Sequence, residues 1–138
     1  MFINPEEITT HLYDYQVEQI TDGSVAIVDE AIATAVEEVK AYLANRYDTD
    51  AIFAKEGSER NPLVLRCCKT VAAYHLLLLC NVDAIYEKYE KAYTKTIEFL
   101  NRIANGHVTV GLPYREADDG TAPGTIQINS NRKFKHQF

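Results

Sequence analysis

The sequence lacks a disulfide framework, although it contains three cysteines. Cys67 and Cys68 are adjacent, and Cys80 lies further along an apolar segment. An odd number of cysteines without framework spacing argues against structural disulfides. We expect the three cysteines to pack in the core as small hydrophobic side chains, as is usual for free cysteine. This pattern is typical of a cytoplasmic protein.

Long apolar runs are also lacking. The longest, Val71 to Cys80, is interrupted by His75, and a membrane helix requires ~20 predominantly apolar residues. The N-terminus has neither the basic start nor the apolar stretch of a signal peptide. We therefore expect a protein that does not associate with membranes, and we expect His75 to be a hydrogen-bonded core histidine.

No pattern of catalytic or metal-binding residues is present. The sequence has no Cys-x-x-Cys, no His-Glu-x-x-His and no glycine-rich phosphate loop. Asp118-Asp119-Gly120 lacks the alternating oxygen ligands and the closing glutamate of a calcium loop. The histidines form no ligand pair at helical spacing; they are His11, His75, His107 and His136. We predict no catalytic residue, no cofactor, no metal site and no enzymatic activity.

Charge is distributed unevenly along the 138 residues, which are enough for one domain. Residues 1–60 hold 13 acidic and 4 basic side chains, a net charge of −9, whereas residues 125–138 have a net charge of +3. An acidic front and a basic tail suit head-to-tail contact between copies of one protein. The alternative is a solvated acidic face beside a disordered end. The total net charge of −6 disfavours nucleic-acid recognition.

Helical start and stop signals predict an all-α fold, a small bundle of about four helices. Asn4-Pro5 and Asn61-Pro62 each combine a capping residue with a proline suited to the first helical position. Gly106 is a stop signal. The expected helices run from Asn4 to about Tyr13, from Asp29 to Tyr47, from Pro62 to about Leu79 and from Asp83 to Asn105. The third is apolar on nearly all sides, so we expect it at the centre of the bundle or in a subunit interface.

The intervening segments are expected to be irregular. Residues 14–27 are predicted to be a connector, with a turn at residues 21–24, and residues 48–60 a polar loop. Gly106 then separates a helical body, residues 1–106, from an extended C-terminal arm, residues 107–138.

The arm contains the residues that we expect to bind partners. Fully extended from Gly106, it could reach roughly 100 Å at about 3.3 Å per residue. Residues 107–110 and 125–129 alternate like short strands, which are marginal alone and need partners. Large aromatics in a polar segment are often interface anchors. The candidate partner-binding residues are Val108, Val110, Ile126, Ile128, Arg132, Lys133, Phe134, Lys135 and Phe138.

The order of several short sequences resembles the family of Mu-like phage and prophage head–tail connector proteins. The similar segments span nearly the whole chain: residues 1–8, 20–22, 28–32, 41–47, 61–65, 73–76, 88–92, Leu100, 104–106, 108–111 and 131–134. Two features depart from the family pattern: Thr70 stands where the family often has an acidic residue, and the loop 48–60 is longer than usual.

The resemblance implies a helical adaptor without catalytic activity that forms a ring below the portal vertex. Its implied partners are other copies of itself, the portal protein and head-closure or tail proteins, and DNA would pass through the ring without specific binding. The implied location is the head–tail junction of the virion, after synthesis in the host cytoplasm. The alternative is a cytoplasmic helical-bundle enzyme or ligand-binding protein with the C-terminal segment as a lid. Self-association would favour the adaptor, and a bound metabolite the alternative.

Deleting residues 125–138 should leave a soluble, cooperatively folding bundle that no longer joins a ring or a portal. The deleted segment is too polar to form a core by itself and contains the aromatic anchors. Thermal unfolding and binding to portal protein measure the two effects separately. Undiminished assembly of the shortened protein would show that the recognition surface lies on the helices.

Overall fold

The computed structural model of the protein describes residues 1–79 and 83–116, and this part of the chain is all-α, as predicted. Its elements, in chain order, are η1 (Pro5–Thr10), α1 (Asp14–Thr21), α2 (Val25–Leu43), α3 (Thr49–Phe53), η2 (Gly57–Glu59), α4 (Pro62–Leu77) and α5 (Asp83–Ala104), where η marks a 3-10 helix.

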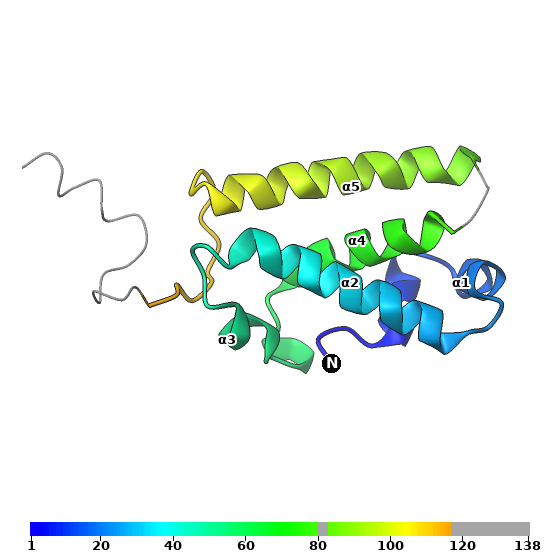
Figure 1. The fold of residues 1–138 in the computed structure, drawn as a ribbon, viewed down its shortest axis with the longest axis horizontal. Helices are drawn as coiled ribbons and strands as arrows, with labels where there is room; N and C mark the ends of the chain where they lie inside the picture. Colours follow the sequence, from blue (N-terminus) through cyan, green and yellow to red (C-terminus); the bar gives the residue numbers. More distant parts are fainter. Residues whose placement is uncertain (80–82, 117–138) are drawn as a thin grey trace, which may run out of the picture.

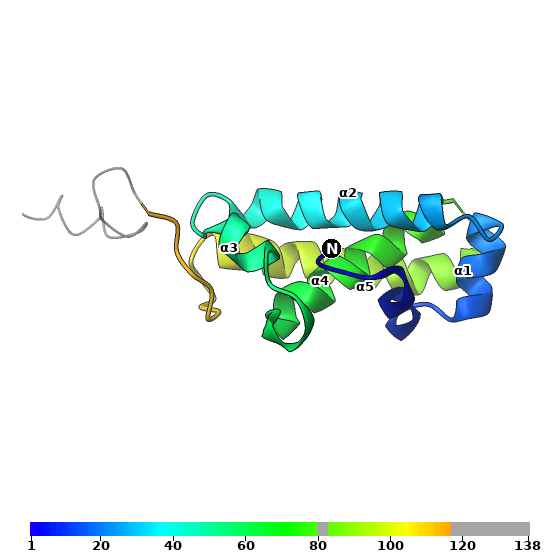
Figure 2. The same ribbon diagram turned by 90° about the horizontal axis from the view of Figure 1, so that it is seen from below.

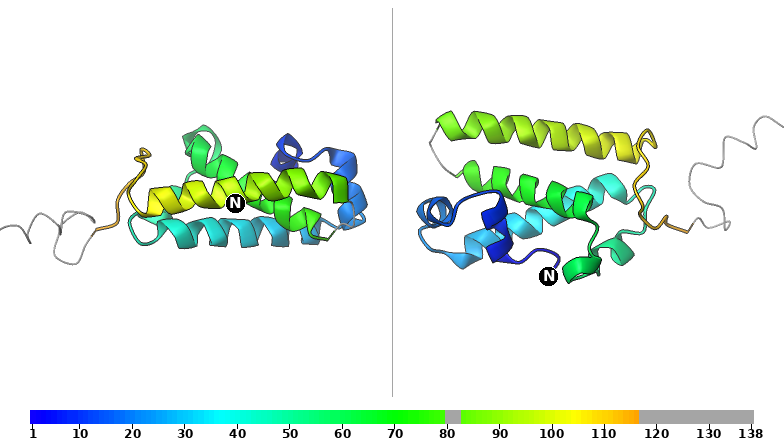
Figure 3. Two further views of the ribbon diagram at one scale, coloured as in Figure 1. Left: turned by 90° about the horizontal axis from the view of Figure 1, so that it is seen from above. Right: turned by 180° about the vertical axis from the view of Figure 1, so that it is seen from behind.

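The three long helices α2, α4 and α5 lie lengthwise beside one another (Figure 1). Helix α4 runs antiparallel to both α2 and α5 (Figure 2). The short elements η1 and α1 lie at the end where α2 begins, and α3 lies at the end where α2 finishes (Figure 3). The described chain leaves the bundle at the α3 end. The body therefore has two distinct ends, which differ in the elements they present.

Helix α4 lies at the centre of the bundle, as its apolar sequence predicts. It begins where expected, because the Asn61 side-chain oxygen accepts hydrogen bonds from the backbone N–H groups of Leu63 (3.0 Å) and Val64 (3.2 Å). Its buried residues face α2, α5 and η1; they are Val64, Cys67, Cys68, Thr70, Val71, Ala72, Ala73, Leu76 and Leu77. The prediction of a central helix is thus confirmed.

Helix α5 ends at the predicted glycine. The N–H of Gly106 donates to the carbonyl of Ile103 (3.1 Å), and the N–H of His107 donates to the carbonyl of Arg102 (2.9 Å), which is a Schellman ending. Gly106 has a φ of 76°, and a Cβ atom there would lie 2.7 Å from Nη1 of Arg46. The positive φ favours glycine at this position, whereas the Arg46 guanidinium is the flexible end of a side chain and could shift.

The predicted connector over residues 14–27 is wrong. The segment forms α1, and α2 begins at Val25 rather than at Asp29. The predicted turn at residues 21–24 is correct in position, with left-handed φ angles at Asp22 (51°) and Gly23 (74°). The loop 48–60 also contains more structure than expected, since the Asp48 side chain caps α3 by accepting from Ala51 N–H (3.0 Å).

The strand expected over residues 107–110 is wrong as well. Residues 107–113 are irregular, and the described residues contain only an isolated antiparallel bridge, between Tyr47 and Tyr114. The alternating apolar side chains nevertheless pack inward. Val108 is half-buried, and Val110 and Leu112 are buried against the helices. The second expected strand, residues 125–129, lies outside the described residues.

A bidentate ion pair holds the N-terminal segment to the loop before α4. The guanidinium of Arg60 donates to both carboxylate oxygens of Glu7 (2.7 and 2.8 Å) and also to the carbonyls of Phe2 (2.7 Å) and Gly57 (2.8 Å). Glu7 in turn accepts from the N–H of Asn4 (2.9 Å), as the capping-box pattern predicts. The pair is largely shielded from solvent, with 11% of the Arg60 and 25% of the Glu7 side chain exposed. Its bidentate geometry makes it stronger than an ordinary surface pair.

Glu7→Gln should lower the free energy of unfolding by about 1–3 kcal/mol at pH 7. The hydrogen bonds from Arg60 hold the pKa of Glu7 at about 2, below its usual value of 4.5. Because the folded-state pKa is depressed, the contribution is present above pH 4.5 and is lost as the pH falls toward 2. Urea unfolding across this range should show the two proteins converging. The exposed Glu59→Gln variant is the control, and a difference that persists at pH 2 would contradict the assignment.

Candidate assembly interface

The first ten residues of the expected arm, 107–116, lie on the helical body. The N–H of Asp48 donates to the carbonyl of Pro113 (2.9 Å), and the N–H of Arg115 donates to the carbonyl of Arg46 (3.0 Å). Between these bonds the rings of Tyr47 and Tyr114 stack, with centroids 5.2 Å apart and planes 17° from parallel. Burial and the neighbouring Tyr114 raise the pKa of Tyr47. The bridge fixes the point at which the rest of the chain leaves the body.

Two of the candidate partner-binding residues therefore have neighbours in their own chain. Val110 is buried in the core and Val108 packs against it, so the structure does not bring either into an exposed edge strand. The remaining candidates lie outside the described residues: Ile126, Ile128, Arg132, Lys133, Phe134, Lys135 and Phe138.

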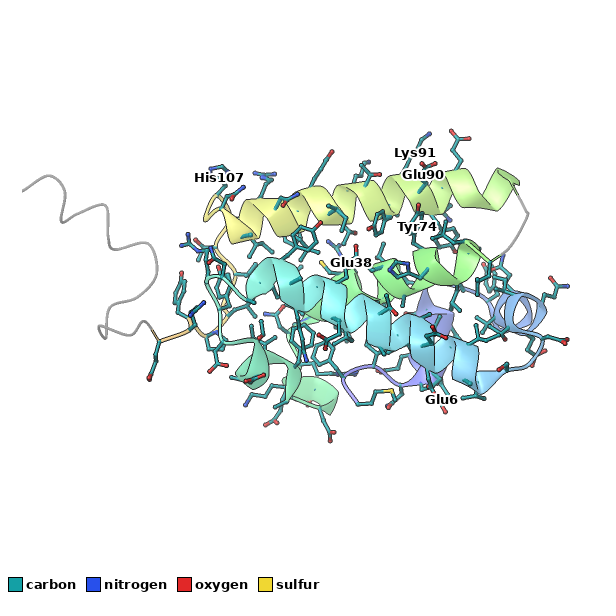
Figure 4. All side chains as sticks on the ribbon, viewed as in Figure 1. Glu6, Glu38, Tyr74, Glu90, Lys91 and His107 are labelled. Carbon is teal, nitrogen blue, oxygen red and sulfur yellow. The ribbon has the colours of Figure 1, made fainter. Side chains whose placement is uncertain are left out.

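A half-buried polar cluster joins the three long helices. His75 Nε2 of α4 lies 2.8 Å from Glu38 Oε2 of α2, and the Tyr93 hydroxyl of α5 donates to Glu38 Oε1 (2.5 Å). Tyr74 stacks on Tyr93 with ring centroids 4.1 Å apart. Glu38 and Tyr74 point into the space between the helices (Figure 4). Burial, followed by the hydrogen bond to Glu38, raises the pKa of Tyr93.

The cluster confirms that His75 is hydrogen-bonded, but its side chain is 24% exposed, so it lies at the edge of the core and not within it. Such a half-buried network constrains the relative positions of α2, α4 and α5, because each polar group has to meet its partner on a neighbouring helix. Sequence reasoning missed it because Glu38, His75 and Tyr93 are far apart in the chain and each has an ordinary place in its own helix.

A groove of about 560 Å³ opens at the α1 end of the body. Elements η1, α1 and the start of α2 form it, and the residues that matter for its chemistry are Pro5, Glu6, Val17, Glu18, Val25 and Val28. Val25 is 62% exposed, which is high for an apolar side chain. Among the described residues no lysine or arginine lines the groove. The site thus combines an apolar surface with two carboxylates, and sequence reasoning missed it because the connector prediction left out α1.

Cys67 and Cys68 are free thiols buried in α4. Burial raises the pKa of Cys67 to about 11 and also raises the pKa of Cys68, so both are protonated at neutral pH and are poor nucleophiles. Within residues 1–79 and 83–116, no group of three histidine, cysteine or carboxylate side chains is placed to hold a metal ion. No helix in the same part of the chain is long and apolar enough to cross a membrane.

Comparison with known families places this helical chain among Mu-like phage proteins. Residues 2–128 match the family described as Bacteriophage Mu, Gp36. The chain therefore belongs to the bacteriophage Mu Gp36 family. No curated protein and no solved structure matches the chain.

Tyr114→Ala should loosen residues 107–116 from the body while the helical bundle stays folded. The substitution removes the ring stacking on Tyr47, and an aromatic pair contributes about 0.5–1.5 kcal/mol beyond its buried area. Hydrogen exchange should become faster at the Asp48 and Arg115 amides, which form the flanking hydrogen bonds. Tyr114→Phe keeps the ring and is the matched control. Unchanged exchange in the alanine variant would show that Val110 and Leu112 hold the segment without the stack.

Proposed function

We propose that this chain is a structural head–tail connector, an adaptor that forms a ring between portal and tail through which DNA passes. The observation that carries the proposal is the match of residues 2–128 to the bacteriophage Mu Gp36 family, which points to a phage structural or assembly protein. The proposed partners are other copies of the chain, the portal protein and head-closure or tail proteins. The proposed location is the head–tail junction, with synthesis and assembly in the host cytoplasm.

The arrangement of the body supports this role. A ring requires a heterologous contact, in which one surface of a copy meets a different surface of the next. The bundle has two unlike ends, with η1 and α1 at one and α3 at the other (Figure 3). The chain leaves the α3 end at the Tyr47–Tyr114 bridge, and 22 residues follow Glu116. At about 3.3 Å per residue, that length could reach roughly 70 Å, far enough to contact a neighbouring subunit.

The charge of the body suits a passage for DNA. Residues 1–60 have a net charge of −9, and α2 exposes Glu30 and Glu37. Carboxylates facing a channel would repel the phosphate backbone and prevent DNA from adhering as it moves. We propose that DNA passes without specific binding.

Mixing this protein with the portal protein of the same phage should produce a ring bound to the portal. Each subunit would contribute one heterologous contact, so the ring should be closed and uniform in size. Mass photometry gives the stoichiometry, and electron microscopy shows whether density is added to one face of the portal. Portal protein alone is the control. A portal preparation that binds other neck proteins but not this chain would contradict the proposal.

A further inference from the structure

The groove at the α1 end has the features of a peptide-binding surface. It is formed by three helical elements, has Val17, Val25 and Val28 on its apolar surface, and includes Glu6 and Glu18. Its volume of about 560 Å³ lies within the range of sites that hold small ligands or side chains.

The C-terminal sequence has the complementary chemistry. Residues 125–138 include three bases, Arg132, Lys133 and Lys135, and no acid. Phe134 and Phe138 lie among these bases, and an aromatic side chain in an apolar pocket is a typical interface anchor. A cationic, aromatic segment fits an apolar groove flanked by carboxylates, because apolar contact gives affinity while opposite charge steers association and fixes register.

The groove and the point where the described chain leaves the body lie at opposite ends of the bundle. The groove is at the α1 end, where Glu6 is located (Figure 4), whereas the described chain ends at the α3 end (Figure 1). To reach its own groove, the tail would have to turn back along the full length of α5, 22 residues or about 33 Å. A neighbouring copy placed head to tail would present its groove at the exit point.

We propose that residues 125–138 of one copy bind the groove between η1, α1 and α2 of the next copy. Phe134 occupies the apolar surface, and the adjacent bases pair with Glu6 and Glu18. Each copy gives one tail and receives one, which is the heterologous contact that a closed ring needs. The inference rests on the proposed connector function for its biological meaning, although the contact itself can be tested without a portal.

A charge-swap experiment on the full chain tests the pairing. The tail variant carries Arg132→Glu, Lys133→Glu and Lys135→Glu, and the groove variant carries Glu6→Lys and Glu18→Lys. Each alone should self-associate at least about tenfold more weakly than the original protein, because like charges then face each other. A mixture of the two should recover association, since the acidic tail of one now fits the basic groove of the other. Sedimentation measures the self-association of the original protein, of each variant and of the mixture.

A matched control makes the same two-charge change, glutamate to lysine, outside the groove. Glu90→Lys with Glu98→Lys alters two exposed carboxylates of α5, and Glu90 points away from the bundle (Figure 4). This variant should associate like the original protein. Thermal unfolding of every variant identifies any that fails to fold, and Phe134→Ala then provides a second test that leaves the groove unchanged. Failure of the mixture to recover association, or an equal loss in the α5 control, would overturn the pairing.

Photo-crosslinking distinguishes contact between copies from contact within one copy. A photoreactive phenylalanine at position 134 should crosslink to peptides of the groove, within residues 5–9, 17–24 or 25–28. In a mixture of ¹⁴N and ¹⁵N protein, those crosslinks should join light to heavy chains. Crosslinks found only within one chain, only outside the groove, or absent altogether would overturn the inference. Portal binding without these crosslinks would leave the connector function intact, whereas the crosslinks without portal binding would count against that function alone.

Discussion

The structure depends on the need to bury α4 on nearly all sides. Arg66 and Lys69 form only a narrow polar strip, and most of the other side chains of α4 are removed from water. At about 25 cal/mol per Å² of apolar surface, burial of such a helix is the dominant favourable term in folding. Helices α2 and α5 cover two sides of α4, and η1 and α1 cover part of the rest. Burial by these neighbouring elements ends near Leu78 and Leu79, which are 50% and 61% exposed.

Covering α4 leaves two ends to be closed, and the chain closes each with a different irregular segment. Near η1, the N-terminal residues are held by Arg60, which bonds to Glu7 and to the Phe2 carbonyl. At the α3 end, residues 107–116 pack Val110 and Leu112 into the core. The groove results from the first arrangement, since η1 and α1 turn beside the start of α2. The exit point of the tail results from the second.

The sequence predicts the parts of this fold that depend on local signals. Asn61-Pro62 and Gly106 mark helix ends through side-chain capping and positive φ, which do not require knowledge of the tertiary structure. Helix α1 was missed because its eight residues are largely polar and Tyr13, which precedes them, is not a usual cap. It is stabilised by packing of Val17 and Ile20 against the core. The groove depends on that helix, so it could not be predicted either.

The segment after α5 shows a second limit of prediction from sequence. The period-two pattern of residues 107–110 predicts a strand, whereas the segment bends and is irregular, with Val108 and Val110 packed against the helices. A sheet partner was expected, and a helical surface is found. The path of the segment depends on contacts that residues 113–115 make with Arg46, Tyr47 and Asp48, about 65 residues away in the chain. Such long-range pairing is outside the reach of single-sequence reasoning.

The Tyr47–Tyr114 bridge also determines how the body would respond to mechanical force. Tension applied to the chain beyond Glu116 reaches the backbone bonds at Arg115 and Asp48 before it reaches α5. Those bonds connect the tail to the junction of α2 and α3, so the pull passes into the long helix α2 instead of unwinding α5 from its C-terminal end. A subunit held by its tail would therefore resist peeling, and its last helix would keep its packing until the bridge had opened.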